Sequence, residues 1–170
     1  LNYDETIASK WEDIRSDGPG IYSSILELTD NSIDWGNADF IEFSFDKLTG
    51  IFKQKDNGPN GFVSPEALHR FFTLGEKNGG VTSVTIGKYG KGGFKACINI
   101  STNLVIMSYF NGEGYCIGTD FNVMERNNSS KPTMPLQIIG NEKENEKENE
   151  KENEKENVGS EFTLQLSARF

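Results

Sequence analysis

The sequence is poor in the residues that build metal centres and disulfide frameworks. Its 170 residues include two cysteines, Cys97 and Cys116, and a single histidine, His69. A structural zinc site needs four ligands, usually Cys and His, so a site of this kind is effectively excluded. We expect both cysteines to remain reduced and to pack as small apolar side chains.

Long apolar runs and an excess of basic charge are also missing. No run approaches the ~18 apolar residues that a membrane-spanning helix needs, and no signal peptide opens the chain. We therefore expect an intracellular protein, cytoplasmic or nuclear, without a membrane partner. The net charge of −9 argues against nonspecific nucleic-acid binding, so a nucleic-acid partner is not indicated for this domain.

Part of the negative charge lies in a repeat without any apolar side chain. Residues 141–157 read NEKENEKENEKENEKEN, with eight Glu and four Lys, which gives −4 and leaves −5 for the rest of the chain. Without an apolar stripe this tract cannot dock on a core as a helix. We predict one domain over 1–170 that carries 141–157 as a solvated low-complexity insertion, disordered or loosely helical.

Apolar spacing predicts the order of helices and strands. After Gly20, the residues Ile21, Ile25, Leu28 and Ser32 share one helical face, and Gly36 ends that helix. Further helices are predicted from Ser64-Pro65 and over 93–100; strands are predicted over 39–46, 51–55, 103–110, 115–123, 136–139 and 161–167, with 103–110 and 115–123 forming a hairpin.

The first chemical signal lies on the predicted long helix. Glu27 and Asn31 are four residues apart, so both side chains project from the same face. A carboxylate at this place can orient and deprotonate a water molecule, and an amide oxygen can ligate Mg²⁺. The alternative interpretation of this pair alone is an ordinary solvated helix face.

Two further signals are glycine-rich. Asp56 follows a strand in the segment DNGPNG, where its carboxylate can accept a hydrogen bond from an exocyclic amino group such as that of adenine, and neighbouring glycines let a flat ring approach the backbone. The segment IGKYGKGGFKA leads into a helix start, where free N–H groups and nearby lysines attract phosphate. Each segment could also be a plain turn or a surface loop.

Together with Gly159-Ser160 before the last strand, these segments resemble the motifs of the GHKL ATPases. ELTDNSID is similar to their ExxDN motif, DNGPNG to DxGxG, IGKYGKGGFKA to GxxGxG, and GS-x-F to the motif that carries Gly-Thr. The resemblance spans residues 21–162. It implies an α+β fold, the Bergerat fold: a two-layer sandwich of a mixed, mostly antiparallel sheet covered on one face by helices.

The resemblance also implies a role for each motif residue, with ATP and Mg²⁺ as cofactors. Glu27 would be the general base, Asn31 the Mg²⁺ ligand, and Asp56 the adenine reader, held by the hydroxyl of Ser160. The remaining nucleotide-binding positions would be Gly58 and Gly61 at the base and Gly87, Gly90, Gly92, Gly93 and Lys95 at the triphosphate, with residues 73–89 as a lid.

The sequence departs from the family pattern at three places. The second motif has the longer spacer Gly58-Pro59-Asn60-Gly61, the third contains an additional glycine at Gly92-Gly93, and Ser160 replaces the usual Thr. These differences bear on the geometry of the nucleotide site and on its turnover rate. The motif that begins at Glu27 resembles that of the gyrase B, heat-shock chaperone, MutL and MORC branch. Ser64-Pro65-Glu66-Ala67-Leu68 after the second motif, followed by IGKYG, is most similar to MORC proteins.

The expected function is ATP binding with slow hydrolysis, acting as a conformational or dimerisation switch in a longer protein that associates with itself. In the family, a following domain donates a lysine to the γ-phosphate, and this chain ends at Phe170. The alternatives are a nucleotide-binding or scaffold module that does not hydrolyse ATP, a histidine-kinase catalytic domain, and an α+β domain whose glycine loops are only loops.

Overall fold

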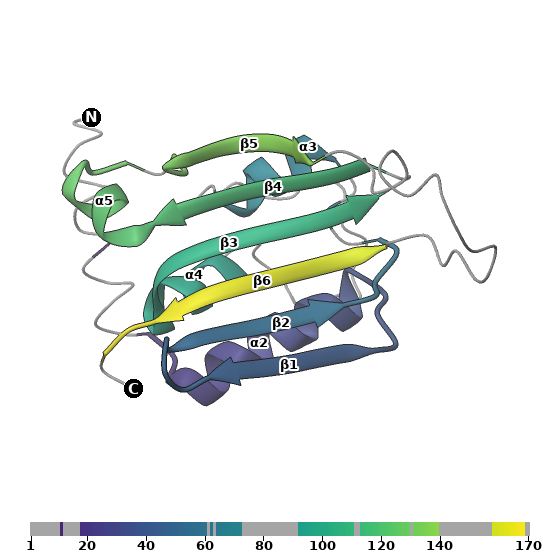
Figure 1. Ribbon diagram of the computed structural model, residues 1–170, viewed down its shortest axis with the longest axis horizontal. Coiled ribbons are helices and arrows are strands. Elements are labelled where there is room, and N and C mark those ends of the chain that lie inside the picture. The colour runs from purple at the N-terminus through teal and green to yellow at the C-terminus, as the bar shows by residue number, and fades with distance from the viewer. Residues whose placement is uncertain are drawn as a thin grey trace.

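A six-stranded antiparallel sheet forms one layer of the molecule. The structure is a computed structural model that describes residues 11, 18–60, 62, 64–72, 92–110, 113–129, 131–139 and 158–168. The strands are β1 (Ile41–Asp46), β2 (Ile51–Asp56), β3 (Ser101–Phe110), β4 (Glu113–Asp120), β5 (Met134–Ile139) and β6 (Gly159–Leu166). Their order is β1-β2-β6-β3-β4-β5, so the last strand lies inside the sheet, between β2 and β3 (Figure 1).

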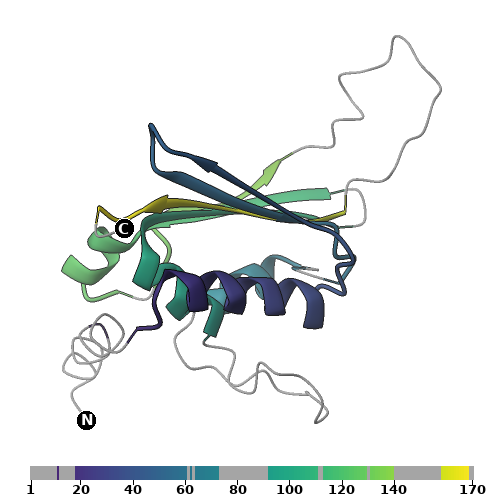
Figure 2. The same ribbon diagram turned by 90° about the horizontal axis from the view of Figure 1, so that it is seen from below.

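Helices α2, α3 and α4 lie under one face of this sheet and form the second layer (Figure 2). Their bounds are Ile21–Asp34 for α2, Pro65–Phe71 for α3 and Gly92–Ile100 for α4. The predicted two-layer α+β fold is confirmed, and every strand pairing among the described residues is antiparallel. Among the described helices, none is long and apolar enough to cross a membrane.

The long helix α2 buries its sheet-facing side at Ser24, Leu28 and Ser32, which are four residues apart. Leu28 and Ser32 belong to the face predicted from the apolar spacing, on which Ile21 and Ile25 are half-buried. The helix begins directly after Gly20, its N-cap. Two of the three buried side chains are serines. Since a core-facing position normally takes an apolar residue, these hydroxyls indicate a polar region between α2 and the sheet.

The helix α5 (Phe121–Arg126) corrects the sequence prediction, which continued the strand of 115–123 as far as Val123. The strand ends at Asp120, whose carboxylate caps α5 by accepting hydrogen bonds from the N–H groups of Asn122 and Val123. An Asp before a helix satisfies N–H groups that have no partner inside the helix. The alternation in the sequence concealed this capping signal.

Aromatic rings join the two layers below the sheet. The ring of Phe71 in α3 lies 5.6–5.8 Å from the ring centroids of Phe62, Phe72, Phe94 and Phe162. Such edge-on contacts stabilise aromatic pairs beyond their buried area. They hold α3 against the start of α4 and against β6. Cys97 packs in the same core, as expected for a reduced cysteine.

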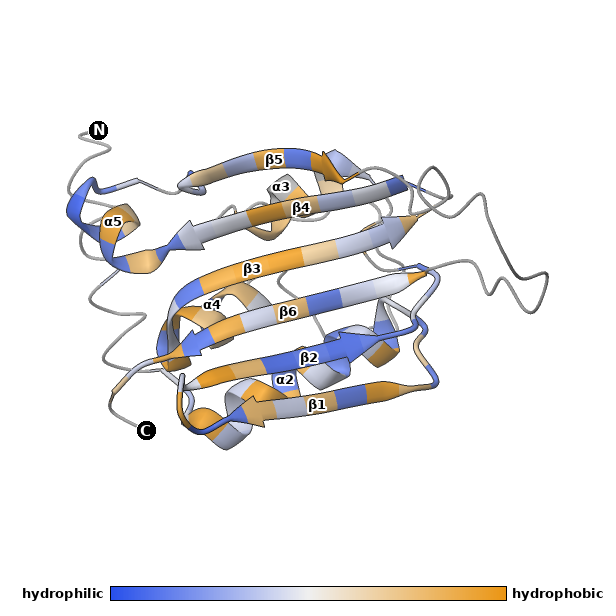
Figure 3. Ribbon diagram, viewed as in Figure 1, coloured by the Kyte–Doolittle hydropathy of each residue, from blue (hydrophilic) through white to orange (hydrophobic). Residues whose placement is uncertain are grey.

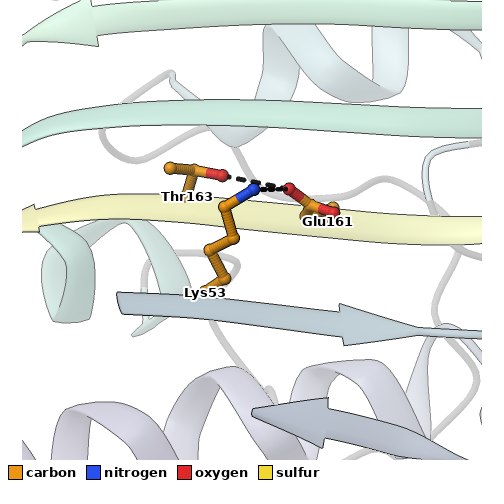
Figure 4. Close-up of polar contacts among 3 residues, drawn as sticks. All are labelled: Lys53, Glu161 and Thr163. Atoms are coloured by element: carbon orange, nitrogen blue, oxygen red, sulfur yellow. Dashed lines mark hydrogen bonds and ion pairs between the residues drawn. The ribbon is translucent and has the colours of Figure 1, made fainter. Parts of the chain in front are cut away.

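Side chains on β2 alternate between the helix layer and the opposite face. Phe52, Gln54 and Asp56 are buried, whereas Lys53 is exposed and forms a 2.9 Å ion pair with Glu161 of β6 (Figure 4). Figure 3 shows that β2 becomes hydrophilic after its first residues, while the middle of β3 stays hydrophobic. The end of β2 is therefore unusually polar for an inner strand, even on its buried side.

Candidate functional site

The carboxylate of Asp56 is the centre of a polar cluster at one end of the sheet. It is 4% exposed and stands at the end of β2, beside the start of β6. The N–H groups of Gly58 and Ser160 donate to Oδ1 at 2.9 and 3.2 Å, and the hydroxyl of Ser32 donates to Oδ2 at 2.9 Å. Three donors from three segments thus hold one buried carboxylate.

Ser160 contacts Asp56 through its backbone and not as the sequence predicted. We expected the hydroxyl of Ser160 to hold the carboxylate, but in the described structure the hydrogen bond comes from its N–H group. The hydroxyl that contacts Asp56 belongs to Ser32, which is also buried. Sequence reasoning placed Ser32 on the core-facing stripe of its helix without assigning it a role at the site.

Glycines permit these close contacts around Asp56. A methyl group on Gly58 would come within 2.6 Å of the Gly36 carbonyl oxygen, and one on Gly159 would overlap the carbonyl oxygen of Asp56. Gly159 also has a φ of +112°, a conformation that side chains rarely adopt. The glycines therefore let α2, β2 and β6 meet at the Asp56 backbone.

The second part of the site lies between α2 and the start of α4. A methyl group on Gly92 would overlap Oε1 of Glu27, and one on Gly93 would lie 2.9 Å from Nδ2 of Asn31. Both predicted side chains of α2 therefore face the first turn of α4. The N–H groups of that turn have no partner within the helix and attract negative charge.

Two adjacent residues of α2 connect the two parts of the site into one region. Asn31, which faces α4, is followed directly by Ser32, which bonds to Asp56. The structure thus brings Glu27, Asn31, Asp56 and Ser160 together from distant parts of the chain, along with Gly58, Gly92 and Gly93. Lys95 lies in α4, one turn beyond its start, and is partly buried.

Some predictions fall on residues outside the described parts of the chain. They are Gly61, Gly87, Gly90, the lid at 73–89 and the insertion at 141–157. These stay predictions.

The buried carboxylate of Asp56 has an altered acidity. Burial raises the pKa of Asp56 above the value of 3.8 for a free side chain, and this effect outweighs the hydrogen bonds from Gly58, Ser32 and Ser160, which act in the opposite direction. Aspartate is seldom buried without a partner cation, so a buried carboxylate with three neutral donors suggests a functional role.

The fold and the site define a two-layer α+β domain with a polar centre between a long helix, a glycine-led helix and one sheet end. A family model described as "Histidine kinase-, DNA gyrase B-, and HSP90-like ATPase" matches residues 21–155. The chain belongs to this family, which the sequence motifs had indicated.

A solved structure supports the same fold. The 43K ATPase domain of Thermus thermophilus gyrase B, in complex with an aminocoumarin, matches with a TM-score of 0.56 and 17% sequence identity. The match covers 87% of this chain and 34% of that chain, so this chain spans about a third of the gyrase structure. A search of the curated proteins found no match.

Proposed function

We propose that this domain binds ATP with Mg²⁺ and hydrolyses it slowly, with Asp56 as the reader of adenine. The observation that carries the proposal is the hydrogen bonding of Asp56. Its Oδ1 accepts two N–H groups and its Oδ2 accepts one hydroxyl. Because each carboxylate oxygen offers about two acceptor positions, one position on Oδ2 receives no hydrogen bond from the described residues.

One remaining acceptor position favours adenine over guanine. Adenine presents a single exocyclic amino group beside a ring nitrogen that is itself an acceptor, and one N–H of that amino group fits Oδ2. Guanine would offer two neighbouring donors, which a carboxylate accepts best with both oxygens free. In Asp56 the oxygen Oδ1 is already occupied by Gly58 and Ser160. A buried acceptor that cannot pair with guanine discriminates strongly between guanine and adenine.

The other end of the site fits a magnesium triphosphate in its donor chemistry. The amide oxygen of Asn31 is a suitable Mg²⁺ ligand, and the first turn of α4, beginning at Gly92 and Gly93, offers free N–H groups to phosphate. We assign Lys95 to charge neutralisation near the phosphates and Glu27 to orienting the attacking water. Bound Mg²⁺ would offset the phosphate charge.

A calorimetric titration with ATP and Mg²⁺ tests the base reader. We expect the Asp56→Asn variant to bind ATP about 10- to 100-fold more weakly than wild type, because an amide cannot give the charge-assisted acceptor that the amino group uses. Asp46→Asn is the matched control, since Asp46 is exposed at the end of β1 and its carboxylate accepts hydrogen bonds from Leu48 and Thr49 of the following turn. Equal ATP affinity in wild type and Asp56→Asn contradicts the proposed site.

The raised pKa of Asp56 gives a further prediction, on pH. Protonation removes the acceptor, so we expect ATP affinity to fall with decreasing pH, starting above the usual titration range of aspartate, and to fall less in Asp56→Asn. The free energy of unfolding changes in the opposite direction: protonating Asp56 relieves its burial cost, so its contribution to stability rises as the pH falls through its folded pKa. Titrations at a series of pH values, paired with urea unfolding, check both signs.

We infer that nucleotide binding serves as a conformational or dimerisation switch of a longer, self-associating intracellular protein, most similar to MORC proteins. Self-association is measured by sedimentation with and without ATP.

The second candidate function is a nucleotide-binding module without hydrolysis, and the longer spacer at 58–61 favours it. The Glu27 variant discussed below distinguishes this module from the slow ATPase.

A further inference from the structure

A buried glutamine lies beside the proposed adenine reader. Gln54 stands on β2 two residues before Asp56, so both side chains face the helix layer. It is 0% exposed. Its amide Nε2 donates to the hydroxyl oxygen of Ser32 at 3.1 Å, and the same hydroxyl donates to Asp56 Oδ2 at 2.9 Å. Gln54 and Asp56 are therefore separated by one hydroxyl group.

The direction of this hydrogen-bond chain fixes the orientation of the Gln54 amide. A serine hydroxyl has one proton, and here Asp56 accepts it. Ser32 can then only accept from Gln54, so the amide must present its nitrogen. Turning the amide over would place two oxygens against each other at Ser32. The carbonyl oxygen Oε1 consequently points away from that hydroxyl.

The carbonyl oxygen Oε1 of Gln54 is buried, and none of the described residues donates a hydrogen bond to it. Burying an acceptor without a donor destabilises the folded state. The neighbouring side chains opposite Gln54 on β1 and β6 are Phe43 and Phe162, which have no donor to offer. An apolar residue would suit this position better for folding alone.

We propose that Gln54 is a second reader of the base, which accepts the other N–H of the exocyclic amino group that Asp56 binds. This inference rests on the proposed adenine site. An amino group has two N–H donors, and the hydrogen-bonded chain through Ser32 has one acceptor position at each end that receives no hydrogen bond from the described residues: one on Asp56 Oδ2, and Gln54 Oε1. Sharing one amino group between them satisfies both acceptors and makes recognition specific for a 6-aminopurine.

The test compares stability and base recognition in the Gln54→Leu variant. We expect its melting temperature without nucleotide to rise, because a buried acceptor without a donor is removed, and its affinity for ATP with Mg²⁺ to fall about tenfold. Purine riboside triphosphate, which lacks the 6-amino group, is the second probe. We expect wild type to bind it more weakly than ATP, and Gln54→Leu to change its binding little.

Gln137→Leu is the matched control, since Gln137 is exposed on β5 at the other side of the sheet. Gln54→Met, which has nearly the same shape as glutamine, replaces Gln54→Leu if the branched side chain prevents folding. Unchanged ATP affinity in both variants overturns the role of Gln54, and so does an equal loss for ATP and the analogue. Failure of wild type to bind ATP overturns instead the proposed function on which this inference rests.

Discussion

Replacing Gly159 by alanine is expected to destabilise the domain by about 2–6 kcal/mol and to abolish ATP binding. The backbone of Gly159 has a φ of +112°, and a side chain forced into such a conformation costs of order 1–3 kcal/mol. The new methyl group would also overlap the carbonyl oxygen of Asp56, and overpacking against rigid backbone costs a further ~1–3 kcal/mol. Urea unfolding measures the loss of stability, and calorimetry measures the loss of binding.

The two effects have one structural cause. Relief of the overlap requires β6 to move away from the end of β2, and this movement withdraws the Ser160 N–H from the Asp56 carboxylate. Gly20→Ala provides the matched control because a methyl group at Gly20 meets no atom within 4 Å. As Gly20 caps α2, we expect this control to cost below ~1 kcal/mol. Equal stability of the two alanine variants would show that the contact at Gly159 is unimportant.

The elements of this fold could be predicted well where the sequence repeats with a clear period. The apolar stripe beginning at Ile21 predicted α2, and alternation predicted β1. The turn signals at 48–50 and 111–112 predicted β2 and the hairpin of β3 and β4. The sheet order could not be predicted from periodicity, because the position of β6 depends on pairing with β2 across more than 100 residues and with β3 across 50 to 65 residues. Helix α5 was missed because an alternating pattern outweighed the cap at Asp120.

In the site, too, the residues of the motifs could be predicted from the sequence, whereas the residues that join the site through tertiary contacts could not. Glu27, Asn31 and Asp56 were predicted as candidates from residue types and spacing, and the structure places them in one connected region. Ser32, directly after the ExxDN residues, and Gln54 were assigned no role from the sequence, although a signal was present: each is a polar residue at a position whose period points to the core. Polar residues at such positions violate the pattern that favours folding and therefore indicate a functional site.

Replacing Glu27 by glutamine is expected to reduce ATP turnover about 10²- to 10⁴-fold, the range that a general base contributes. Glutamine keeps the shape of the side chain that lies against Gly92 but cannot accept a proton from water. Because wild-type hydrolysis is expected to be slow, single-turnover measurements with excess protein and labelled ATP over hours are the appropriate assay. Glu42→Gln, at an exposed position of β1, is the matched control.

Binding by the Glu27→Gln variant distinguishes loss of chemistry from loss of the site. The Glu27 carboxylate lies beside the first turn of α4, where the triphosphate is proposed to bind, and two negative groups repel each other. Removing the charge should therefore leave ATP affinity unchanged or strengthen it while turnover falls. A loss confined to turnover is the signature of a group needed only in the transition state. If wild type and Glu27→Gln hydrolyse ATP at the same rate, Glu27 is no general base. If that shared rate is also no faster than hydrolysis of ATP without protein, the domain is a nucleotide-binding module, because binding is then the only property that the site supplies.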